Sequence, residues 1–328
     1  MIKAYLYRNN NEKIQTELRL SDIKQYTEEP KPEANETLLW VDIYDTSPAE
    51  LHSLAEIFDF HPLAIEDCLH HTLRSKVDKY DDYTFFVFND VKYNEDKEEE
   101  ITTQELNVFL GQNFIVTVHQ NQIPAIGKVV RKLAYSTKAM EKGPDYLFYL
   151  LIDEIVDEYF PILERISERI DELEDEMYIN PAQEISEEFL ALKRTIVLFR
   201  RVVQPKKRIF ANVGSRYRFK VQEENVPYFM DLVDHLERIS DSLEVFRDLV
   251  SGAMDTYFSL VSARTNDAMK KLTIITTLTA VLTAITGFFG MNTPIPFQDS
   301  PVTTYVILGI VILLPIAGWL YALKRYIQ

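Results

Sequence analysis

Small and polar side chains recur every three or four residues along the last third of the chain. The steps alternate strictly between four and three, which is the 3.5-residue period of a stripe on a helix that faces other helices. A hydrophobic seam holds Leu or Ile at such positions, whereas most positions here hold hydroxyls, an amide, a carboxylate or small groups. The stripe consists of Asp255, Ser259, Ser262, Asn266, Met269, Thr273, Thr276, Ala280, Thr283 and Gly287.

Within a bilayer, a stripe of this kind either packs helices closely or lines water. Close packing is the usual role of small residues in membrane helices. However, Asp255 and Asn266 continue the stripe ahead of the apolar stretch, where close packing of helices would exclude a carboxylate. One or two helices cannot enclose a hole, so lining water requires several chains around an axis. The stripe therefore predicts an oligomeric pore.

Two apolar stretches near the C-terminus are long enough to cross a membrane. Residues 272–291 and residues 301–323 contain no charged side chain, and about 20 residues suffice to span the hydrocarbon core. Lys270 and Lys271 precede the first stretch and Lys324 and Arg325 follow the second, whereas residues 292–300 contain no Lys or Arg. Positively charged flanks remain inside. We therefore expect a multi-pass protein of the cell (inner) membrane with both termini in the cytoplasm and an outward loop.

The part of the chain that precedes the two apolar stretches divides into two regions with different sequence patterns. Residues 1–140 are expected to form an α/β domain, with strands at residues 38–43, 83–91 and 106–118, a hairpin at residues 111–113, and a helix from Ser47 to Phe60 opened by a capping box. Long helices follow: residues 145–178, kinked at Pro161 and ended by Asn180 and Pro181; a second from about residue 186; and one from Pro227 to Gly290.

The expected fold class is thus an α+β membrane protein. Its regions are a cytoplasmic α/β domain over residues 1–140, a cytoplasmic long-helix region over 141–271, a pore-lining span over 272–291, an outer loop over 292–300, a second span over 301–323 and a cytoplasmic tail over 324–328.

Composition excludes several functions. The chain carries a net charge of −16, and the basic C-terminal segment leaves about −19 on residues 1–269, so nucleic acid is not an expected partner. Cys68 is the single cysteine, which precludes an internal disulfide or a thiolate cluster. The sequence holds no Walker A motif, no Ser/His/Asp order and no glycine-rich phosphate loop. We therefore expect neither an enzyme nor an organic cofactor.

Three residues between the two spans, Gly290-Met291-Asn292, resemble the signature of the CorA family of magnesium transporters. The stretches at residues 61–67 (HPLAIED) and 226–231 (VPYFMD) resemble further motifs of that family, and so do residues 246–252 and 265–266. The resemblance implies a homopentamer with a funnel-shaped cytoplasmic part, in which the long helix lines the pore and Gly290, Met291 and Asn292 form a selective mouth. Neutral amide oxygens suit Mg2+, which sheds water reluctantly.

The resemblance also implies carboxylates between subunits that sense cytoplasmic Mg2+ and keep the pore shut. By motif, Asp67 and Asp231 match this pair, with Glu66 and Asp153 as secondary ligands. Without the bound ion these acids repel each other and loosen the interface. The sequence departs from the family pattern at Ser75, Phe289 and Thr293, which leaves the choice of ion and the strength of closure open.

Two other functions remain as alternatives. The same architecture can transport Zn2+, Co2+ or Ni2+, as a channel or coupled to protons, and uptake assays with each ion distinguish this alternative. A membrane-anchored scaffold or sensor whose helices merely associate is the other, and it predicts that Asn292→Ala leaves cation flux unchanged.

Overall fold

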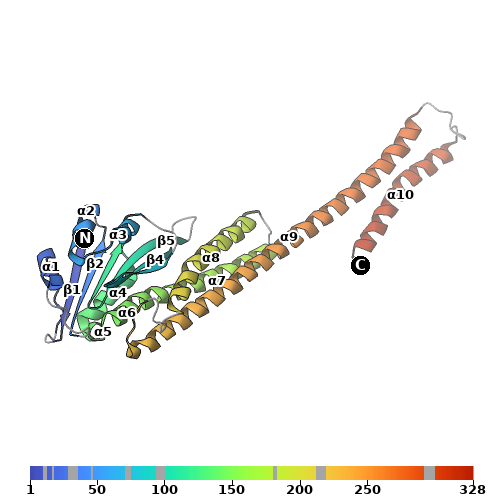
Figure 1. Ribbon diagram of the computed structural model, residues 1–328. Helices are drawn as coiled ribbons and strands as arrows, with labels where there is room; N and C mark the ends of the chain where they lie inside the picture. Colours follow the sequence, from blue (N-terminus) through green and yellow to red (C-terminus); the bar gives the residue numbers. More distant parts are fainter. Residues whose placement is uncertain are drawn as a thin grey trace. The chain divides into compact units, whose positions relative to one another are not determined.

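The computed structural model describes residues 1–9, 13–16, 18–28, 36–45, 47–70, 75–93, 101–179, 183–211, 219–291 and 300–327. It divides into two compact units, Met1–Ala253 and Met254–Gln328 (Figure 1). Asn292, most of the expected outer loop and the break expected at Asn180 and Pro181 lie outside the described residues.

A six-stranded sheet is the framework of the first unit (Figure 1). Its order is β1-β2-β6-β5-β4-β3, with β2 and β6 parallel and every other neighbouring pair antiparallel. The strands are β1 (Ile2–Arg8), β2 (Thr37–Tyr44), β3 (Lys76–Lys79), β4 (Tyr83–Tyr93), β5 (Ile101–Gly111) and β6 (Phe114–His119). The three predicted strands correspond to β2, β4 and the β5–β6 hairpin. Gly111 fits the hairpin because a Cβ there would lie 2.3 Å from the Phe114 ring.

Successive side chains of β4 point to opposite faces of the sheet, and helices cover both faces. Phe85 and Val87 belong to a core with α1 (Leu20–Glu28), α2 (Pro48–Phe58) and α3 (Pro62–Leu69). Phe86 and Phe88 face the other layer, where both pack against Phe148 of α6. The helices α4 (Pro124–Tyr135) and α5 (Lys138–Glu141) precede α6 in the chain and contact it.

The predicted capping box is confirmed at the start of α2. The Ser47 side chain accepts from the Glu50 backbone N–H, and the Glu50 carboxylate accepts from the Ser47 backbone N–H. These two bonds satisfy amides that the first helical turn leaves unpaired. Asp59 follows the last helical residue and caps the helix in the left-handed conformation, with φ 53°.

The long helix predicted over residues 145–178 is two helices, and the break is not at Pro161. α6 (Pro144–Asp157) ends before Glu158, and α7 (Tyr159–Ile179) begins after it. A proline ring clashes with the carbonyl of the residue four positions earlier, which for Pro161 is Asp157. The interruption therefore falls at Glu158, directly after Asp157, and Pro161 itself lies in the first turn of α7, where its missing N–H costs little.

Two antiparallel helices complete the first unit. α8 (Gln183–Phe210) packs against α7. Side-chain contacts join α8 to the start of α9 (Val226–Gly290), which a short 3-10 turn (Glu223–Asn225) precedes. Gln204 of α8 donates to Ser240 of α9 at 2.7 Å, and Lys207 pairs with Glu237 at 2.8 Å. The expectation of one uninterrupted helix up to Gly290 is confirmed.

The second unit holds the rest of α9 and α10 (Pro301–Ile327). Among the described residues, one helix, Glu223–Phe288, is long and apolar enough to cross a membrane, and no residue of its apolar window is buried. The second predicted span is helical as α10, with an apolar stretch over Pro301–Leu313. Several α10 side chains lie outside the described set.

Candidate cation-binding site

The start of α6 is fixed to the start of α9 by a buried carboxylate. Asp145 accepts from the Gln222 backbone N–H at 2.7 Å and from the Asn225 side-chain amide at 3.1 Å. Burial raises the pKa of Asp145, and these hydrogen bonds oppose the rise. The contacts set the register of the two helices, and with it the side chains that face each other further along.

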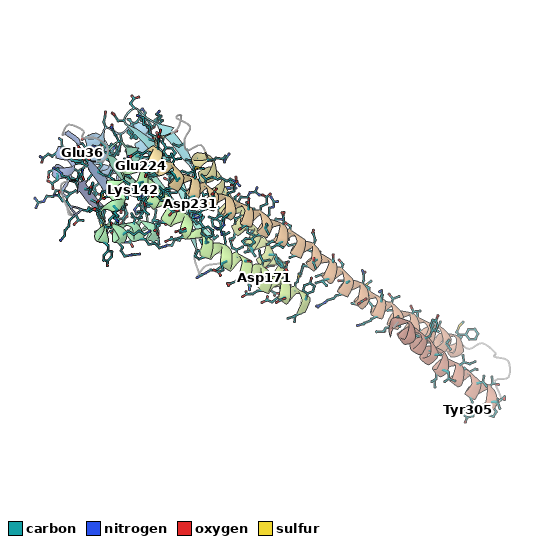
Figure 2. The ribbon with its side chains drawn as sticks, turned by 90° about the horizontal axis from the view of Figure 1, so that it is seen from below. Glu36, Lys142, Asp171, Glu224, Asp231 and Tyr305 are labelled. Carbon is teal, nitrogen blue, oxygen red and sulfur yellow. The ribbon has the colours of Figure 1, made fainter. Side chains whose placement is uncertain are left out.

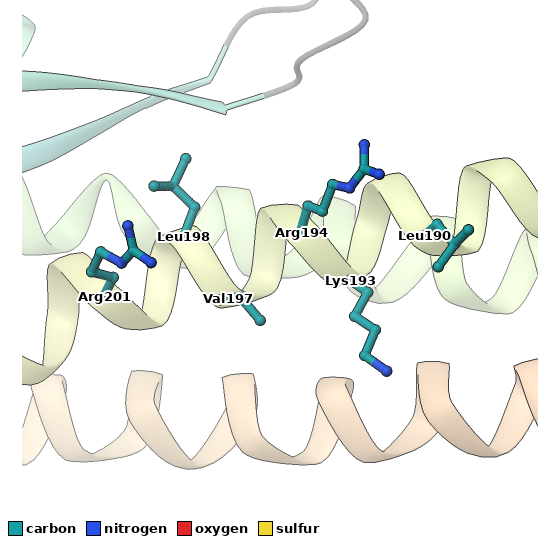
Figure 3. Close-up of a pocket in the computed structure, with 6 residues that line it drawn as sticks. All are labelled: Leu190, Lys193, Arg194, Val197, Leu198 and Arg201. Atoms are coloured by element: carbon teal, nitrogen blue, oxygen red, sulfur yellow. The ribbon is translucent and has the colours of Figure 1, made fainter.

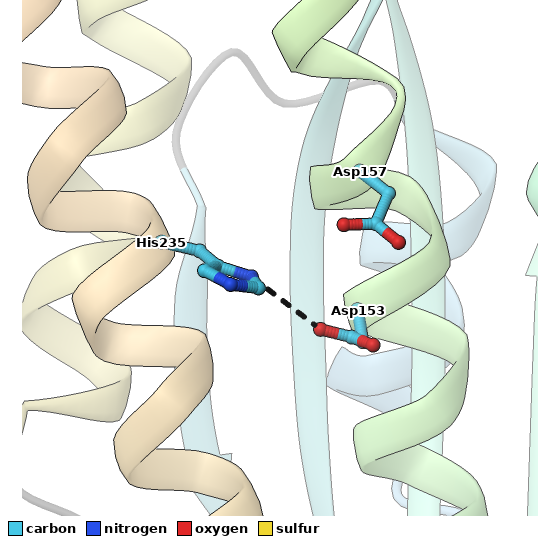
Figure 4. Close-up of side chains that lie close together, drawn as sticks. All are labelled: Asp153, Asp157 and His235. Atoms are coloured by element: carbon cyan, nitrogen blue, oxygen red, sulfur yellow. Dashed lines mark ion pairs between the residues drawn. The ribbon is translucent and has the colours of Figure 1, made fainter.

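Two turns along α6, Asp153 and Asp157 meet His235 of α9 (Figure 4). Their ligand atoms all lie within 4.8 Å of one another. The two aspartates are four residues apart and therefore share one helix face. His235 Nδ1 lies 3.8 Å from Asp153 Oδ1, which is too long for a hydrogen bond. Both atoms are buried and have no hydrogen-bond partner among the described residues.

Burial and like charge both act on this cluster. The pKa of Asp153 is raised, first by burial and then by the charge of Asp157, while a 3.1 Å hydrogen bond from the Tyr149 hydroxyl and the proximity of His235 oppose the rise. Asp231, one turn before His235, places Oδ2 3.9 Å from His235 Nε2 and is 62% exposed (Figure 2 labels it). A divalent cation at this position would relieve the repulsion and occupy the two unsatisfied atoms.

The donor set is mixed. Mg2+ prefers oxygen and keeps several of its waters, whereas imidazole nitrogen suits Zn2+, Ni2+ and Cu2+. Two carboxylates fit either kind of ion, directly or through bound water. The cluster therefore fits a divalent cation, and its histidine extends the range beyond Mg2+.

The predicted primary ligands lie on different helices. Asp67 is on α3, where its Oδ2 accepts from Lys76 Nζ at 2.7 Å, and its neighbour Glu66 is exposed. α3 packs on one face of the sheet, while α6, which carries Asp153, packs on the other. The fold of one chain thus gathers Asp153 and Asp231 but leaves Glu66 and Asp67 in the opposite layer.

Sequence reasoning missed Asp157 and His235. Each stands four residues after a predicted ligand, Asp157 after Asp153 and His235 after Asp231. That spacing places each pair on one helix face and was the available signal. The meeting of the two faces is a tertiary contact that spacing alone does not show.

In the second unit the polar stripe lies along α9. Its ten positions are all exposed within the chain. The three threonine hydroxyls of the stripe bond back into the helix: Thr273 donates to the Met269 carbonyl at 2.8 Å, Thr276 to that of Leu272 at 2.9 Å and Thr283 to that of Thr279 at 2.8 Å. Each hydroxyl hydrogen is thereby used, and the oxygen faces outward as an acceptor. Gly290 ends the helix and Met291 is exposed.

A shallow depression on α8 is chemically unsuited to a cation (Figure 3). It is lined by apolar and basic side chains without a carboxylate: Leu190, Lys193, Arg194, Val197, Leu198 and Arg201. The cation cluster and the stripe, by contrast, both carry oxygen-bearing side chains that could contact a metal ion or its waters.

Known proteins share both sequence and fold with this chain. The profile of the family described as CorA-like Mg2+ transporter protein matches residues 35–325. The putative metal ion transporter YfjQ of Bacillus subtilis is 37% identical over 253 residues, 77% of this chain and 78% of that protein. The cobalt/magnesium transport protein CorA of Thermotoga maritima is 34% identical over 258 residues, 78% of this chain and 73% of that protein.

The fold matches a full-length solved structure, the complete structure of the CorA magnesium transporter from Methanocaldococcus jannaschii. The TM-score is 0.82 at 23% identity, over 99% of this chain and 98% of that one. A family profile that spans most of the sequence, relatives above 30% identity over three quarters of it and a shared fold agree: the chain belongs to the CorA-like Mg2+ transporter family, a family of membrane metal ion transporters.

Proposed function

We propose that this protein passes hydrated Mg2+ into the cytoplasm through a pore that several copies, in the manner of a homopentamer, build around the α9 stripe. The observation that carries the proposal is the stripe itself. Nine exposed small or polar positions and Met269 follow one face of an apolar helix and lead to Gly290-Met291-Asn292. A hydrated cation presents water hydrogens outward, and outward hydroxyl oxygens without a free hydrogen are suitable acceptors for them.

In this proposal the protein lies in the cell membrane with both termini in the cytoplasm, and Gly290, Met291 and Asn292 form the outer mouth. Asn292 offers neutral carbonyl oxygens, which bind the hydrated ion weakly enough to release it. Family membership supports metal ion transport as the activity, and the relative in Thermotoga maritima is called a cobalt/magnesium transport protein. Co2+, Ni2+ and Zn2+ are therefore the competitors to test.

Flux of Mg2+ into proteoliposomes containing the purified full-length protein tests the activity. Asn292→Ala should abolish uptake, because the mouth loses its amide ring, whereas Asn266→Ala near the cytoplasmic end should only reduce it. Parallel assays with Co2+, Ni2+ and Zn2+ identify the preferred ion. Uptake of Zn2+ that needs a proton gradient, without uptake of Mg2+, contradicts the proposal. Unchanged flux in Asn292→Ala favours a scaffold or sensor.

Regulation by cytoplasmic Mg2+ is the second half of the proposal. Asp67 and Asp231 are the proposed ligands between subunits, with Glu66 and Asp153 as secondary ligands and with Asp157 and His235 added by the geometry. Two facts support a site shared between copies: Asp67 and Asp153 lie on opposite faces of one chain's sheet, and the Asp153–His235 pair has two buried atoms that no described residue hydrogen-bonds. Bound Mg2+ would tie the copies together, and its loss would let their acids repel.

The double variant Asp67→Ala/Asp231→Ala should remain active at internal Mg2+ concentrations that silence the parent. Flux measured against internal Mg2+ checks this, and unchanged inhibition in the double variant contradicts it.

A further inference from the structure

Lys76 holds one of the proposed regulatory carboxylates. Its Nζ lies 2.7 Å from Asp67 Oδ2 and 2.9 Å from Asp78 Oδ2. The ammonium therefore sits between two carboxylates, and the Asp67 side chain that it reaches is 20% exposed. Burial lowers the pKa of Lys76, but its hydrogen bonds with Asp67 and Asp78 outweigh burial and raise the pKa.

Strand β4 positions both partners of this ion pair. β3 begins at Lys76 and pairs with β4, with Lys76 opposite Val87. The preceding residue, Ser75, accepts from the Asn89 backbone N–H of β4 at 3.0 Å. On the other side, the His61 backbone N–H at the start of α3 donates to the hydroxyl of Tyr83, also on β4, at 2.8 Å. Both partners of the ion pair are thus carried by elements fastened to one strand.

We propose that Lys76 is an internal competitor of the regulatory cation: its ammonium occupies the Asp67 carboxylate when the cation is absent and must be displaced for the cation to bind. This rests on the proposed role of Asp67 as a regulatory ligand. The competition sets the Mg2+ concentration at which the protein responds, because each binding event must first break an ion pair. Asp78 moderates the competition, since it offers Lys76 a second carboxylate once Asp67 is taken.

Replacement of Lys76 by an uncharged side chain should therefore sensitise the protein to Mg2+. Lys76→Met should lower the Mg2+ midpoint about two- to fivefold, the range for partly exposed ion pairs. The first readout is protection of the purified full-length protein from limited proteolysis as Mg2+ is raised, because a ligand that binds the folded state stabilises it. The second is the internal Mg2+ concentration that halves flux. Lys76→Arg should keep the parent midpoint within about twofold.

Changes at Asp78 should move the midpoint the other way. In Asp78→Asn, Lys76 loses its alternative partner and holds Asp67 more firmly, so more Mg2+ is needed. In the Lys76→Met background the same Asp78→Asn change should have little further effect, because it acts through the lysine. A direct loss of electrostatic attraction for Mg2+ would instead raise the midpoint equally in both backgrounds.

Two matched variants distinguish the loss of the ion pair from a change in net charge as the cause of a shifted midpoint. Lys79→Met removes an exposed lysine from the same strand, and Asp81→Asn removes an exposed aspartate from the turn that follows. Both should leave the midpoint near that of the parent. A Lys76→Met midpoint that moves no further than that of Lys79→Met overturns the role of Lys76.

The two proposals fail in different ways. A parent protein that Mg2+ neither protects nor inhibits overturns the regulatory site, and the role of Lys76 with it. A responsive parent with an unshifted Lys76→Met overturns only the role of Lys76. If Lys76→Met does not assemble, Asp78→Asn against Asp81→Asn decides the question alone: an upward shift specific to Asp78→Asn supports the competition, and equal midpoints reject it.

Discussion

Lys206 is a lysine without access to solvent. Its ammonium donates to the Tyr159 hydroxyl at 2.8 Å and to the backbone carbonyl of Asn89, while Tyr159 donates onward to Asp90 at 2.8 Å. Asp90 also accepts from the Gln104 amide at 2.9 Å. The network joins α8 and α7 to strands β4 and β5. A charge is expensive to bury, and it is tolerated here because every partner is positioned for it.

Removal of this ammonium should destabilise the first unit. Lys206→Met deprives the Asn89 carbonyl and Tyr159 of a donor and leaves the Asp90 carboxylate without its nearby cation, at a cost of about 3 kcal/mol. That corresponds to a fall of roughly 6–12 °C in melting temperature for a domain of this size. Lys207→Met is the matched control, since its 2.8 Å pair with Glu237 lies at the surface. Equal melting temperatures for the two variants would contradict a stabilising network.

The same lysine predicts a dependence on pH. Burial lowers the pKa of Lys206 to about 8, and the charge of Asp90 opposes the shift. An unfolded lysine titrates near 10.4. Between about pH 8 and pH 10 the unfolded chain therefore keeps a proton that the folded chain has released, and stability rises with pH. The difference in melting temperature between parent and Lys206→Met should widen from pH 7.5 to pH 9.5; a difference that narrows would refute the assignment.

At the scale of the element, α9 combines two tasks on one helix. Near its start it presents His235 to α6, and further along it carries the stripe. The threonines of the stripe show how a helix can be polar without exposing donors. Each described hydroxyl returns its hydrogen to a carbonyl four residues earlier, so the surface that remains consists of acceptors and methyl groups.

Thr283→Val tests whether the acceptor oxygen matters for conduction. Valine keeps the shape and removes the oxygen, and loss of a hydrogen bond to a hydrated ion should lower Mg2+ flux about tenfold or more. Thr283→Ser should retain most of the flux. The control is Thr286→Val, because Thr286 donates to the Leu282 carbonyl at 2.9 Å in the same manner but lies off the stripe. Equal losses in Thr283→Val and Thr286→Val would point to helix packing instead.

Helices and strands with strong local signals could be predicted from the sequence. Contacts between side chains of different elements could not. The capping box of α2, strands β2 and β4, the β5–β6 hairpin and the uninterrupted α9 follow from caps, alternation and the absence of proline. The break between α6 and α7 was misplaced at Pro161, because proline disturbs the carbonyl four residues before it rather than its own position. Asp157 and His235 escaped prediction because many acids stand four residues apart on helices, and only the packing of α6 on α9 selects these.

The distribution of charge over the whole chain favours contact with cations. About −19 of charge lies on residues 1–269, while the apolar remainder carries a small positive charge. The exposed positions of α7 are rich in carboxylates, including Asp171 (labelled in Figure 2). A surface of this kind concentrates cations near it and repels nucleic acid and other anions.

If several chains build one pore, one defective chain should abolish conduction by the whole assembly. When half of the co-expressed chains carry Asn292→Ala, an assembly of five that needs every copy should keep about 3% of the parent flux rather than half. Flux into proteoliposomes at several known ratios of differently tagged chains measures this. A fall in proportion to the fraction of parent chains would mean that each chain conducts by itself.

The short strand β3 has a consequence for solubility. It forms one edge of the sheet, where unpaired backbone groups invite another strand to add. Four residues in length, it carries charge at Lys76, Asp78 and Lys79, and charged side chains on a brief edge discourage such addition. Lys76, which we propose competes with a metal ion, therefore also reduces the tendency of this sheet edge to aggregate. A chain that lost two of these three charges, as in Lys76→Met/Asp78→Asn, should pair more readily with strands of other chains during folding.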